Sequence, residues 1–373
     1  MDKIKVLHVA QAAGGVDCYI RMFLKYLNKE RFENILVCSQ DFHREDYDGL
    51  VDCFEQIEMF RTIGINDLKT IIAFRKLIKK YKPDIVYAHS SKAGAIARVA
   101  DIGLKNHCIY NPHGWAFNMR CSNIKRMLYT MIEKVAAHFC DKIICISMEE
   151  KKSALNKKIC KENKLKVIFN GVDIETYENS QHGLVKRADL NIPNNSFVVG
   201  MVGRITPQKA PDVFVKMAII IKNKIPNAHF IMVGEGEQEM KIKKYAEDNG
   251  LSDSLHITGW VNNPMSYVEI FDVACLLSRW EGFGLVIPEY MMACKPIVAS
   301  RVDAIPDIIQ DGENGLLVDV DNAIEASKSV LRLYHENDLK NKLVARGLED
   351  VHKNFDVKRV SYEHEMLFEN IVK

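Results

Sequence analysis

The chain has 373 residues, of which 47% are hydrophobic and 27% are charged, and its net charge is +2. This length exceeds what one hydrophobic core usually supports, so we expect two globular domains. No low-complexity tract and no repeat of solenoid period is present, which excludes an extended disordered or repeat protein.

The ten cysteines are scattered between Cys18 and Cys294 without a Cys-x-x-Cys pair. We therefore expect most of them to be buried thiols in a reducing cytoplasm rather than a zinc site or a disulfide framework. The first ten residues are typical of a strand rather than a signal peptide, and no apolar run reaches the roughly 18 residues of a spanning helix.

The charge is unevenly distributed along the chain. Residues 1–180 carry 29 Lys and Arg against 22 Asp and Glu, whereas the remainder carries 22 against 27. The stretch 120–166 alone holds 12 basic and 5 acidic residues, so an anionic surface is one candidate partner of the first half.

Short apolar runs rich in β-branched residues alternate with helical patterns. In the first half these runs are 4–9, 35–38, 84–88, 108–110, 142–146 and 166–169. After a polar stretch at about 175–195 the alternation restarts with 197–202, 229–233, 254–257, 272–277, 296–299 and 315–318. The pattern predicts an α/β fold of two Rossmann-like, doubly wound domains.

The predicted domains are residues 1–180 and 181–355. The last residues, 356–373, read as a helix whose aromatic side chains predict packing back on the first domain. Open α/β sheets bind ligands outside the carboxyl ends of their strands, so the loops that follow the predicted strands are the candidate sites.

Two of these loops belong to the first domain. Gly14 and Gly15 precede a predicted helix, where the backbone can approach a phosphate; a plain tight turn is the alternative. His113 lies with Gly114 and Trp115 after another strand, and it is either a structural histidine or one that faces a ligand.

The other two loops belong to the second domain. Arg204 and Lys209 follow its first strand, and together they can converge on a diphosphate, unless both are merely solvated. Glu281 and Glu289 flank a glycine-containing turn, where carboxylates can accept hydrogen bonds from sugar hydroxyls; a helix cap with surface glutamates is the alternative.

Taken in order, these motifs resemble glycosyltransferase family 4, whose GT-B architecture has two Rossmann-like domains facing a central cleft. The resemblance also covers the segments 169–173, 234–236 and 89–94, and the last of these is similar to the branch that builds capsule, exopolysaccharide or O-antigen units. It implies a retaining, metal-independent hexosyltransferase. The donor would be a nucleotide-diphosphate sugar, most often a UDP-sugar carrying a hexose or an N-acetylhexosamine.

The resemblance also implies a role for each site residue. Arg204 and Lys209 would hold the donor diphosphate, Glu289 the ribose and Glu281 the transferred sugar. Catalysis would rest on His113 and Glu281, and the remaining contacts would come from Gly15 and from the backbone of Phe283, Gly284 and Leu285.

No Asp-x-Asp motif stands where a metal-dependent sugar transferase would use one, so we expect neither a metal ion nor another cofactor. Two positions depart from the family pattern. The segment 302–307 lacks the usual Gly-Gly and Pro-Glu pairs, which leaves its contacts open. Asp17 stands where glutamate is more usual, a change that we expect to be harmless.

Three other functions remain open on this architecture: a nucleotide-sugar epimerase, a pyridoxal-dependent phosphorylase and a non-catalytic nucleotide-sugar sensor. The phosphorylase is disfavoured because no lysine is convincingly placed for a Schiff base. A nucleic-acid partner is not expected.

The resemblance implies a glycan acceptor, such as a saccharide linked through diphosphate to a membrane lipid. We therefore expect a cytoplasmic protein held peripherally at the inner face of the membrane by its basic region; a solvated helix face is the alternative. The basic residues are Arg120, Lys125, Arg126, Lys134, Lys142, Lys151, Lys152, Lys157, Lys158, Lys161, Lys164 and Lys166.

Overall fold

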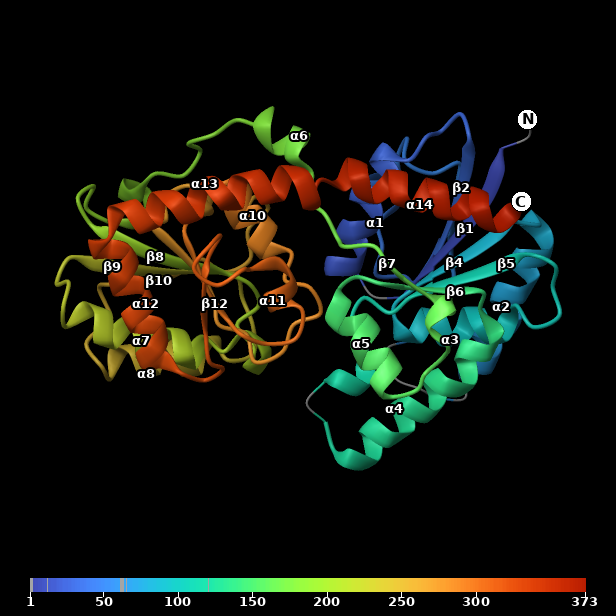
Figure 1. Ribbon diagram of the computed structural model, residues 1–373, viewed down its shortest axis with the longest axis horizontal. Coiled ribbons are helices and arrows are strands. Elements are labelled where there is room, and N and C mark those ends of the chain that lie inside the picture. The colour runs from blue at the N-terminus through green and yellow to red at the C-terminus, as the bar shows by residue number, and fades with distance from the viewer. Residues whose placement is uncertain (1–2, 12, 61–63, 65, 120) are drawn as a thin grey trace. The chain divides into compact units, whose positions relative to one another are not determined.

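The computed structural model describes residues 3–11, 13–60, 64, 66–119 and 121–373. The chain divides into two compact units (Figure 1). Unit 1 comprises Met1–Asp173 together with Asp356–Lys373, and unit 2 comprises Ile174–Phe355.

Unit 1 contains a seven-stranded sheet in the order β3-β2-β1-β4-β5-β6-β7, and all its strand pairs are parallel. Side chains on the two faces of β1 belong to different apolar clusters. Val6 and Ala10 lie in one cluster, and Leu7 and Val9 lie in the other. The sheet is thus buried on both faces, as a parallel sheet requires. The strands are β1 (Ile4–Ala10), β2 (Phe32–Cys38), β3 (Cys53–Gln56), β4 (Ile85–His89), β5 (His107–Asn111), β6 (Lys142–Cys145) and β7 (Leu165–Val167).

The helices of unit 1 include one that comes from the far end of the sequence. The last helix, α14, lies along α1 (Figure 1), where Phe368 packs edge-on against Phe23 and Phe32. The Ser361 hydroxyl also donates to the Phe23 carbonyl at 3.0 Å. The main helices are α1 (Gly15–Tyr26), α2 (Asn66–Tyr81), α3 (Ser91–Ala100), α4 (Asn123–Ala136), α5 (Met148–Asn156) and α14 (Val357–Val372).

Unit 2 contains a six-stranded parallel sheet in the order β10-β9-β8-β11-β12-β13. In both sheets the strand order reverses beside the first strand of the unit, which marks the edge where such folds bind ligands. The strands are β8 (Phe197–Val202), β9 (Ala228–Val233), β10 (Leu255–Ile257), β11 (Val273–Leu276), β12 (Ile297–Ser300) and β13 (Leu316–Val318).

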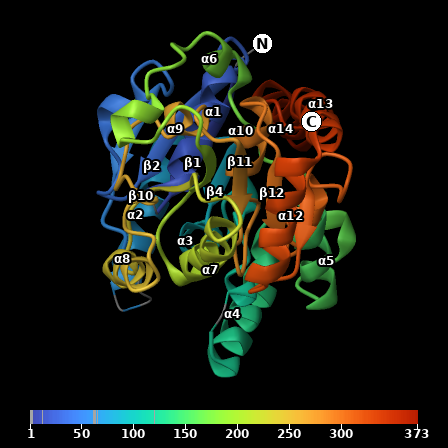
Figure 2. The same cartoon turned by 90° about the vertical axis from the view of Figure 1, so that its left-hand side faces the viewer.

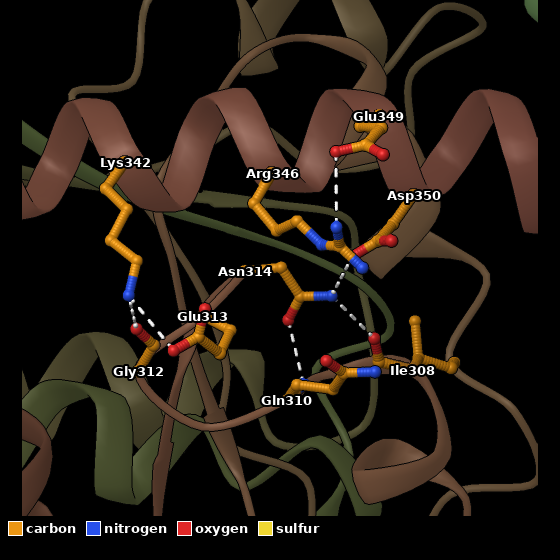
Figure 3. A network of polar contacts seen from close by, with 9 residues as sticks. All are labelled: Ile308, Gln310, Gly312, Glu313, Asn314, Lys342, Arg346, Glu349 and Asp350. Atoms are coloured by element: carbon orange, nitrogen blue, oxygen red, sulfur yellow. Dashed lines mark hydrogen bonds and ion pairs between the residues drawn. The ribbon is translucent and has the colours of Figure 1, made fainter.

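Asn314 fastens the segment before β13 to a long helix of unit 2 (Figure 3). Its amide nitrogen donates to the Ile308 carbonyl at 3.0 Å and to Asp350 at 2.8 Å, and its Oδ1 accepts from the Gln310 amide at 2.8 Å. The main helices of this unit are α6 (Ile174–Glu178), α7 (Pro211–Lys222), α8 (Glu239–Glu247), α9 (Met265–Val268), α10 (Val286–Met292), α11 (Ile305–Ile308), α12 (Ala323–His335) and α13 (Asn337–Asn354).

The structure differs from the sequence-based description in two places. Strand β3 was not predicted, because this short edge strand is only partly buried and contains no apolar run. The boundary between the units falls at 173/174 rather than 180/181. The segment after Asp173 belongs to unit 2, where the Glu269 carboxylate accepts hydrogen bonds from the His182 ring at 2.5 Å and the Gly183 amide at 2.6 Å.

Candidate functional site

The loop after β8 packs against the loop after β9, and glycines make this contact possible. The Gly203 amide donates to the Val233 carbonyl at 2.9 Å, and a Cβ at Gly234 would lie 2.3 Å from the Gly203 carbonyl oxygen. Both glycines have positive φ angles, 153° for Gly203 and 135° for Gly234. A side chain at position 234 would force the two loops apart.

Arg204 and Lys209, both expected to bind diphosphate, are in different states. The Arg204 side chain is exposed and forms no ion pair within the described part of the chain. The Lys209 ammonium is largely buried and lies 2.5 Å from Oε2 of Glu281. Arg204 therefore presents an unpaired guanidinium, whereas Lys209 already shares its charge with the carboxylate that we expected to contact the sugar.

The loop that carries Glu281 is held from three directions. Besides Lys209, the Ser278 hydroxyl donates to Glu281 Oε2 at 3.2 Å. The Glu281 amide donates to Oδ2 of Asp303 at 2.8 Å, which gives the 302–307 segment a contact that the sequence left open. Glu281 is thus fixed in position before any ligand is bound.

Arg279 joins this loop to the segment around Lys209. Its guanidinium contacts Asp212 at 2.7 Å and the Pro207 carbonyl at 2.9 Å, and its amide donates to the Gln208 carbonyl at 2.8 Å. The two donor loops that the sequence placed about 70 residues apart therefore form one connected structure.

The turn between the two glutamates presents backbone rather than side chains. The Phe283 side chain is buried and packs edge-on against Phe355, so a contact with a ligand would have to come from its backbone. Gly284 has a φ of 88°, and the Gly284 and Leu285 amides precede α10 without an acceptor among the described residues. These two N–H groups can serve an anion or a sugar hydroxyl.

Glu289 lies in α10 with its side chain partly buried, and no described group donates a hydrogen bond to it. Burial raises the pKa of the Glu289 carboxyl to about 7, and the positive charge of Lys209 opposes this rise. A partly buried carboxyl without a partner is disposed to accept hydrogen bonds from a ligand, which would favour its ionised form.

In unit 1, the glycine turn leaves open space where a ligand could approach. Gly14 has a φ of 115°, and a Cβ added at Gly14 or Gly15 would meet nothing within 4 Å. Ala12, which belongs to the same turn in the sequence, lies outside the described residues. Asp17 accepts a hydrogen bond from the Tyr47 hydroxyl at 2.6 Å and pairs with Arg21 at 2.8 Å, which gives it a local structural role.

His113 is held in an unusual backbone conformation at the end of β5. Its φ is 50°, and its amide donates to Oδ1 of Asn111 at 2.9 Å. The imidazole lies edge-on to Tyr19 with ring centroids 4.6 Å apart, and its Nε2 is 3.2 Å from Nδ1 of His89. Burial lowers the pKa of His113 to about 3, so the ring is neutral at ordinary pH.

The basic region of the first half includes α4, a helix that projects away from the sheet of unit 1 (Figure 2) and carries an exposed apolar face. Ile124, Met127 and Met131 expose 76%, 65% and 54% of their surface, and Leu128 and Val135 extend the same face. Helical spacing of three and four residues makes these side chains one stripe. One interpretation of the sequence was that these apolar residues form the buried face of a helix. In the structure this face is exposed.

Several basic side chains of this region are engaged inside unit 1. Lys164 donates to two backbone carbonyls at 2.8 and 2.9 Å, and Lys151 pairs with Glu162 at 2.8 Å. Lys157 and Lys158, by contrast, are exposed and form no ion pair with a described residue. Arg120 lies outside the described residues, so the structure places only part of the predicted cluster.

The structure describes no three His, Cys, Asp or Glu side chains that could together hold a metal ion. Among the helices that it describes, none is long and apolar enough to span a bilayer.

Comparison with known proteins decides the family. The model "Glycosyltransferase Family 4" matches residues 13–176, and "Glycosyl transferases group 1" matches residues 185–350. The chain is 33% identical over 360 residues to an Escherichia coli protein named UDP-Gal:alpha-D-GlcNAc-diphosphoundecaprenol alpha-1,3-galactosyltransferase, an alignment that covers 92% of this chain and 93% of the relative. The chain belongs to glycosyltransferase family 4.

Two further matches extend the likeness of this family 4 member over its whole length. It is 25% identical to the capsular polysaccharide biosynthesis glycosyltransferase CapM of Staphylococcus aureus, covering 100% of this chain and 99% of CapM. Its fold matches that of Anabaena Alr3699/HepE in complex with UDP and glucose with a TM-score of 0.83, at 19% identity, over 98% of this chain and 99% of that chain.

These findings confirm the predicted family and the GT-B fold with its two parallel-sheet units. The family 4 member is a glycosyltransferase that transfers a sugar from a nucleotide sugar in polysaccharide biosynthesis.

Proposed function

We propose that this enzyme is a retaining hexosyltransferase that moves a hexose or an N-acetylhexosamine from a UDP-sugar to a lipid-diphosphate-linked saccharide. The observation that carries the proposal is the 33% identity over nearly the whole chain to an enzyme named for UDP-Gal and for a diphosphoundecaprenol-linked acceptor. The HepE structure, which has the same fold, contains UDP and glucose.

In unit 2 we assign the donor contacts to the two connected loops. Arg204 and Lys209 bind the diphosphate, because an exposed guanidinium and a partly buried ammonium supply charge-assisted hydrogen bonds to phosphate oxygens. Glu289 accepts hydrogen bonds from the ribose hydroxyls, and Glu281, oriented by Lys209, contacts the transferred sugar.

Backbone groups complete the donor contacts. The amides of Phe283, Gly284 and Leu285 meet the sugar or the phosphates, and those of Gly284 and Leu285 have no acceptor among the described residues. Following the family resemblance, Gly15 in unit 1 contacts the phosphates through its backbone, and a Cβ added there would meet no described residue within 4 Å. These assignments follow the family resemblance residue by residue.

His113 contacts the transferred sugar near the anomeric carbon as a neutral imidazole. The enzyme supplies no nucleophile of its own. We propose that the acceptor hydroxyl attacks on the face from which the nucleoside diphosphate departs, and that the departing phosphate takes the hydroxyl proton. The protein then contributes alignment and stabilisation of the diphosphate charge, and the anomeric configuration is retained.

The reaction is proposed to need neither a metal ion nor another cofactor, because Arg204 and Lys209 supply the positive charge that the leaving diphosphate requires. Transfer should therefore continue at an unchanged rate after treatment with EDTA. A rate that falls with EDTA and returns with Mg²⁺ or Mn²⁺ would contradict this part of the proposal.

The donor and acceptor are tested together with a panel of UDP-, GDP- and dTDP-sugars and two acceptors, a synthetic lipid-diphosphate sugar and the same sugar without lipid. We expect one UDP-sugar to be consumed at a rate that depends on the lipid-linked acceptor, and NMR of the product to show a retained configuration. Donor isomerisation without an acceptor would favour an epimerase instead, and donor binding without turnover a sensor.

The exposed face of α4 supports peripheral attachment to an anionic membrane, at whose surface a lipid-linked acceptor lies. An apolar stripe of Ile124, Met127 and Met131 can enter the interfacial region, while exposed lysines such as Lys157 and Lys158 attract anionic headgroups, each by about 1 kcal/mol near the surface. The apolar stripe and the exposed lysines would therefore both favour binding to an anionic membrane.

Liposome flotation tests this attachment. The triple substitution of Ile124, Met127 and Met131 by Gln should weaken binding to anionic vesicles, and Lys157→Glu with Lys158→Glu should make the remaining binding less sensitive to salt. Met240→Gln, which changes an even more exposed apolar side chain in unit 2, is the control and should bind normally. Equal recovery of the wild type with neutral and anionic vesicles would refute the proposal.

A further inference from the structure

A chain of buried polar side chains crosses the sheet of unit 1 and ends at His113. Oδ1 of Asn34 in β2 lies 3.3 Å from Nε2 of His8 in β1, and Nδ1 of His8 lies 3.2 Å from Nε2 of His89 at the end of β4. Nδ1 of His89 lies 3.2 Å from Nε2 of His113, which follows β5. Because β2, β1, β4 and β5 are consecutive neighbours in the sheet, the chain runs across it from strand to strand.

The three imidazoles are neutral. His8 and His89 are completely buried, and burial lowers the pKa of His8 to about 4 and that of His89 well below its usual range. His113 and His8 lower the pKa of His89 further, and His364 lowers the pKa of all three rings. A neutral imidazole has one N–H donor and one lone pair, so every link in the chain must point in the same direction.

The first link sets that direction. Because the amide oxygen of Asn34 faces His8, His8 donates from Nε2 and its Nδ1 is the acceptor. His89 then donates from Nε2 to His8, and His113 donates from Nε2 to His89. Nδ1 of His113 is therefore unprotonated and carries a lone pair, and no described group donates a hydrogen bond to it. Such an atom accepts a hydrogen bond from a hydroxyl but repels a phosphate oxygen.

We propose that Asn34 is a positioning residue which, through His8 and His89, holds His113 as the Nε2–H tautomer, so that Nδ1 accepts a hydrogen bond from a hydroxyl of the sugar substrate. The sugar contact rests on the proposed function of His113. The tautomer is a property of the protein alone and can be tested without any substrate.

A second network of hydrogen bonds holds the backbone of His113. This network does not contact the imidazole nitrogens of His113, so it does not determine the tautomer. The His113 amide donates to Oδ1 of Asn111, whose amide nitrogen donates to the Tyr87 hydroxyl at 3.3 Å. Nδ1 of His364 in α14 donates to the Val360 carbonyl at 2.7 Å, so its Nε2 is an acceptor, 3.0 Å from the Tyr87 hydroxyl and 3.1 Å from the Tyr19 hydroxyl. A change at Asn34 should therefore alter the His113 tautomer without displacing its loop.

The test compares two substitutions of Asn34 in the full-length enzyme. Asn34→Asp keeps an acceptor opposite His8, whereas Asn34→Leu, which has the same branched skeleton, removes it. ¹⁵N NMR of histidine-labelled protein distinguishes a protonated from a bare ring nitrogen, and the resonances of His113 are assigned by their loss in His113→Ala. In the wild type and in Asn34→Asp we expect His113 to carry its proton on Nε2.

In Asn34→Leu we expect a mixture of the two His113 tautomers and a fall in transfer of about 3- to 10-fold, the size of one neutral hydrogen bond. Affinity for the nucleoside diphosphate, which has no transferred sugar, should be unchanged. A wild-type His113 protonated on Nδ1, or His113 resonances that are identical in Asn34→Leu, would overturn the proposal. If the tautomer shifts as expected but transfer does not change, the relay stands and the sugar contact of His113 is wrong.

Discussion

The raised pKa of Glu289 predicts that the affinity for the donor depends on pH. Burial raises the pKa of its carboxyl to about 7 in the unliganded protein, even though Lys209 opposes the rise. In the proposed complex the ribose hydroxyls donate to the carboxylate, which lowers its pKa because hydrogen bonds to the charged form favour that form. Binding then releases a proton wherever the unliganded carboxyl is protonated, so affinity rises as the pH is raised through 7.

The size of the effect follows from the fraction of ionised carboxyl. With a pKa of about 7, roughly 10% of Glu289 is ionised at pH 6 and roughly 90% at pH 8, so affinity should differ about ninefold, or ~1.3 kcal/mol. Calorimetry should use an intact UDP-sugar without acceptor. Its diphosphate does not titrate in this range, whereas that of free UDP does.

Two variants decide the assignment. Glu289→Gln removes the titrating group and should bind the UDP-sugar more weakly at pH 8 but with little dependence on pH. Glu237→Gln, a change at an exposed carboxylate of the same unit, should retain the wild-type profile. If wild-type affinity is the same at pH 6 and pH 8, the carboxyl of Glu289 does not bind the ribose in its ionised form.

Three further outcomes are expected. Arg204→Ala should weaken UDP binding by about 1.5–3 kcal/mol in calorimetry, the value of a hydrogen bond to a charged group, and unchanged affinity would remove Arg204 from the donor site. Lys209→Ala should weaken UDP binding and also lower the thermal stability, since it leaves the Glu281 carboxylate buried without its cation; adding Glu281→Gln should restore the stability but not the transfer activity. Gly94→Ala should lower the melting temperature, because the new Cβ would lie 2.2 Å from an aromatic ring, whereas Gly64→Ala, with open space around it, should melt like the wild type.

The sequence was most informative where the strands are buried on both faces. The predicted 197–202 coincides with β8, and 229–233 differs from β9 by one residue, because an uninterrupted apolar run has few alternatives to a central parallel strand. Strand β3 was missed for the opposite reason, since its sequence is short, mixed and half-exposed.

For the site, the sequence located the loops but did not predict the ion pair between two of them. The fold brings Lys209 against Glu281 although 72 residues separate them, and local patterns do not encode such a contact. His8 and Asn34 did leave a signal that went unused. Each is a buried polar residue with buried apolar neighbours in its strand, a placement that requires a hydrogen-bond partner.

In the proposed donor complex, Lys209 binds the diphosphate and also orients Glu281, which contacts the sugar. The ion pair between the two side chains is compatible with both roles. An ammonium group has three N–H donors, and Glu281 takes one of them, so two remain for phosphate oxygens. In the proposed complex, Lys209 therefore need not release Glu281 when it binds the donor. Because the Glu281 amide is held by Asp303 and its carboxylate by Ser278 and Lys209, the carboxylate keeps its orientation throughout. The exposed guanidinium of Arg204 has no such partner among the described residues. In the proposed complex it can therefore follow the diphosphate as the bond to the sugar breaks, while the lysine and glutamate hold their positions.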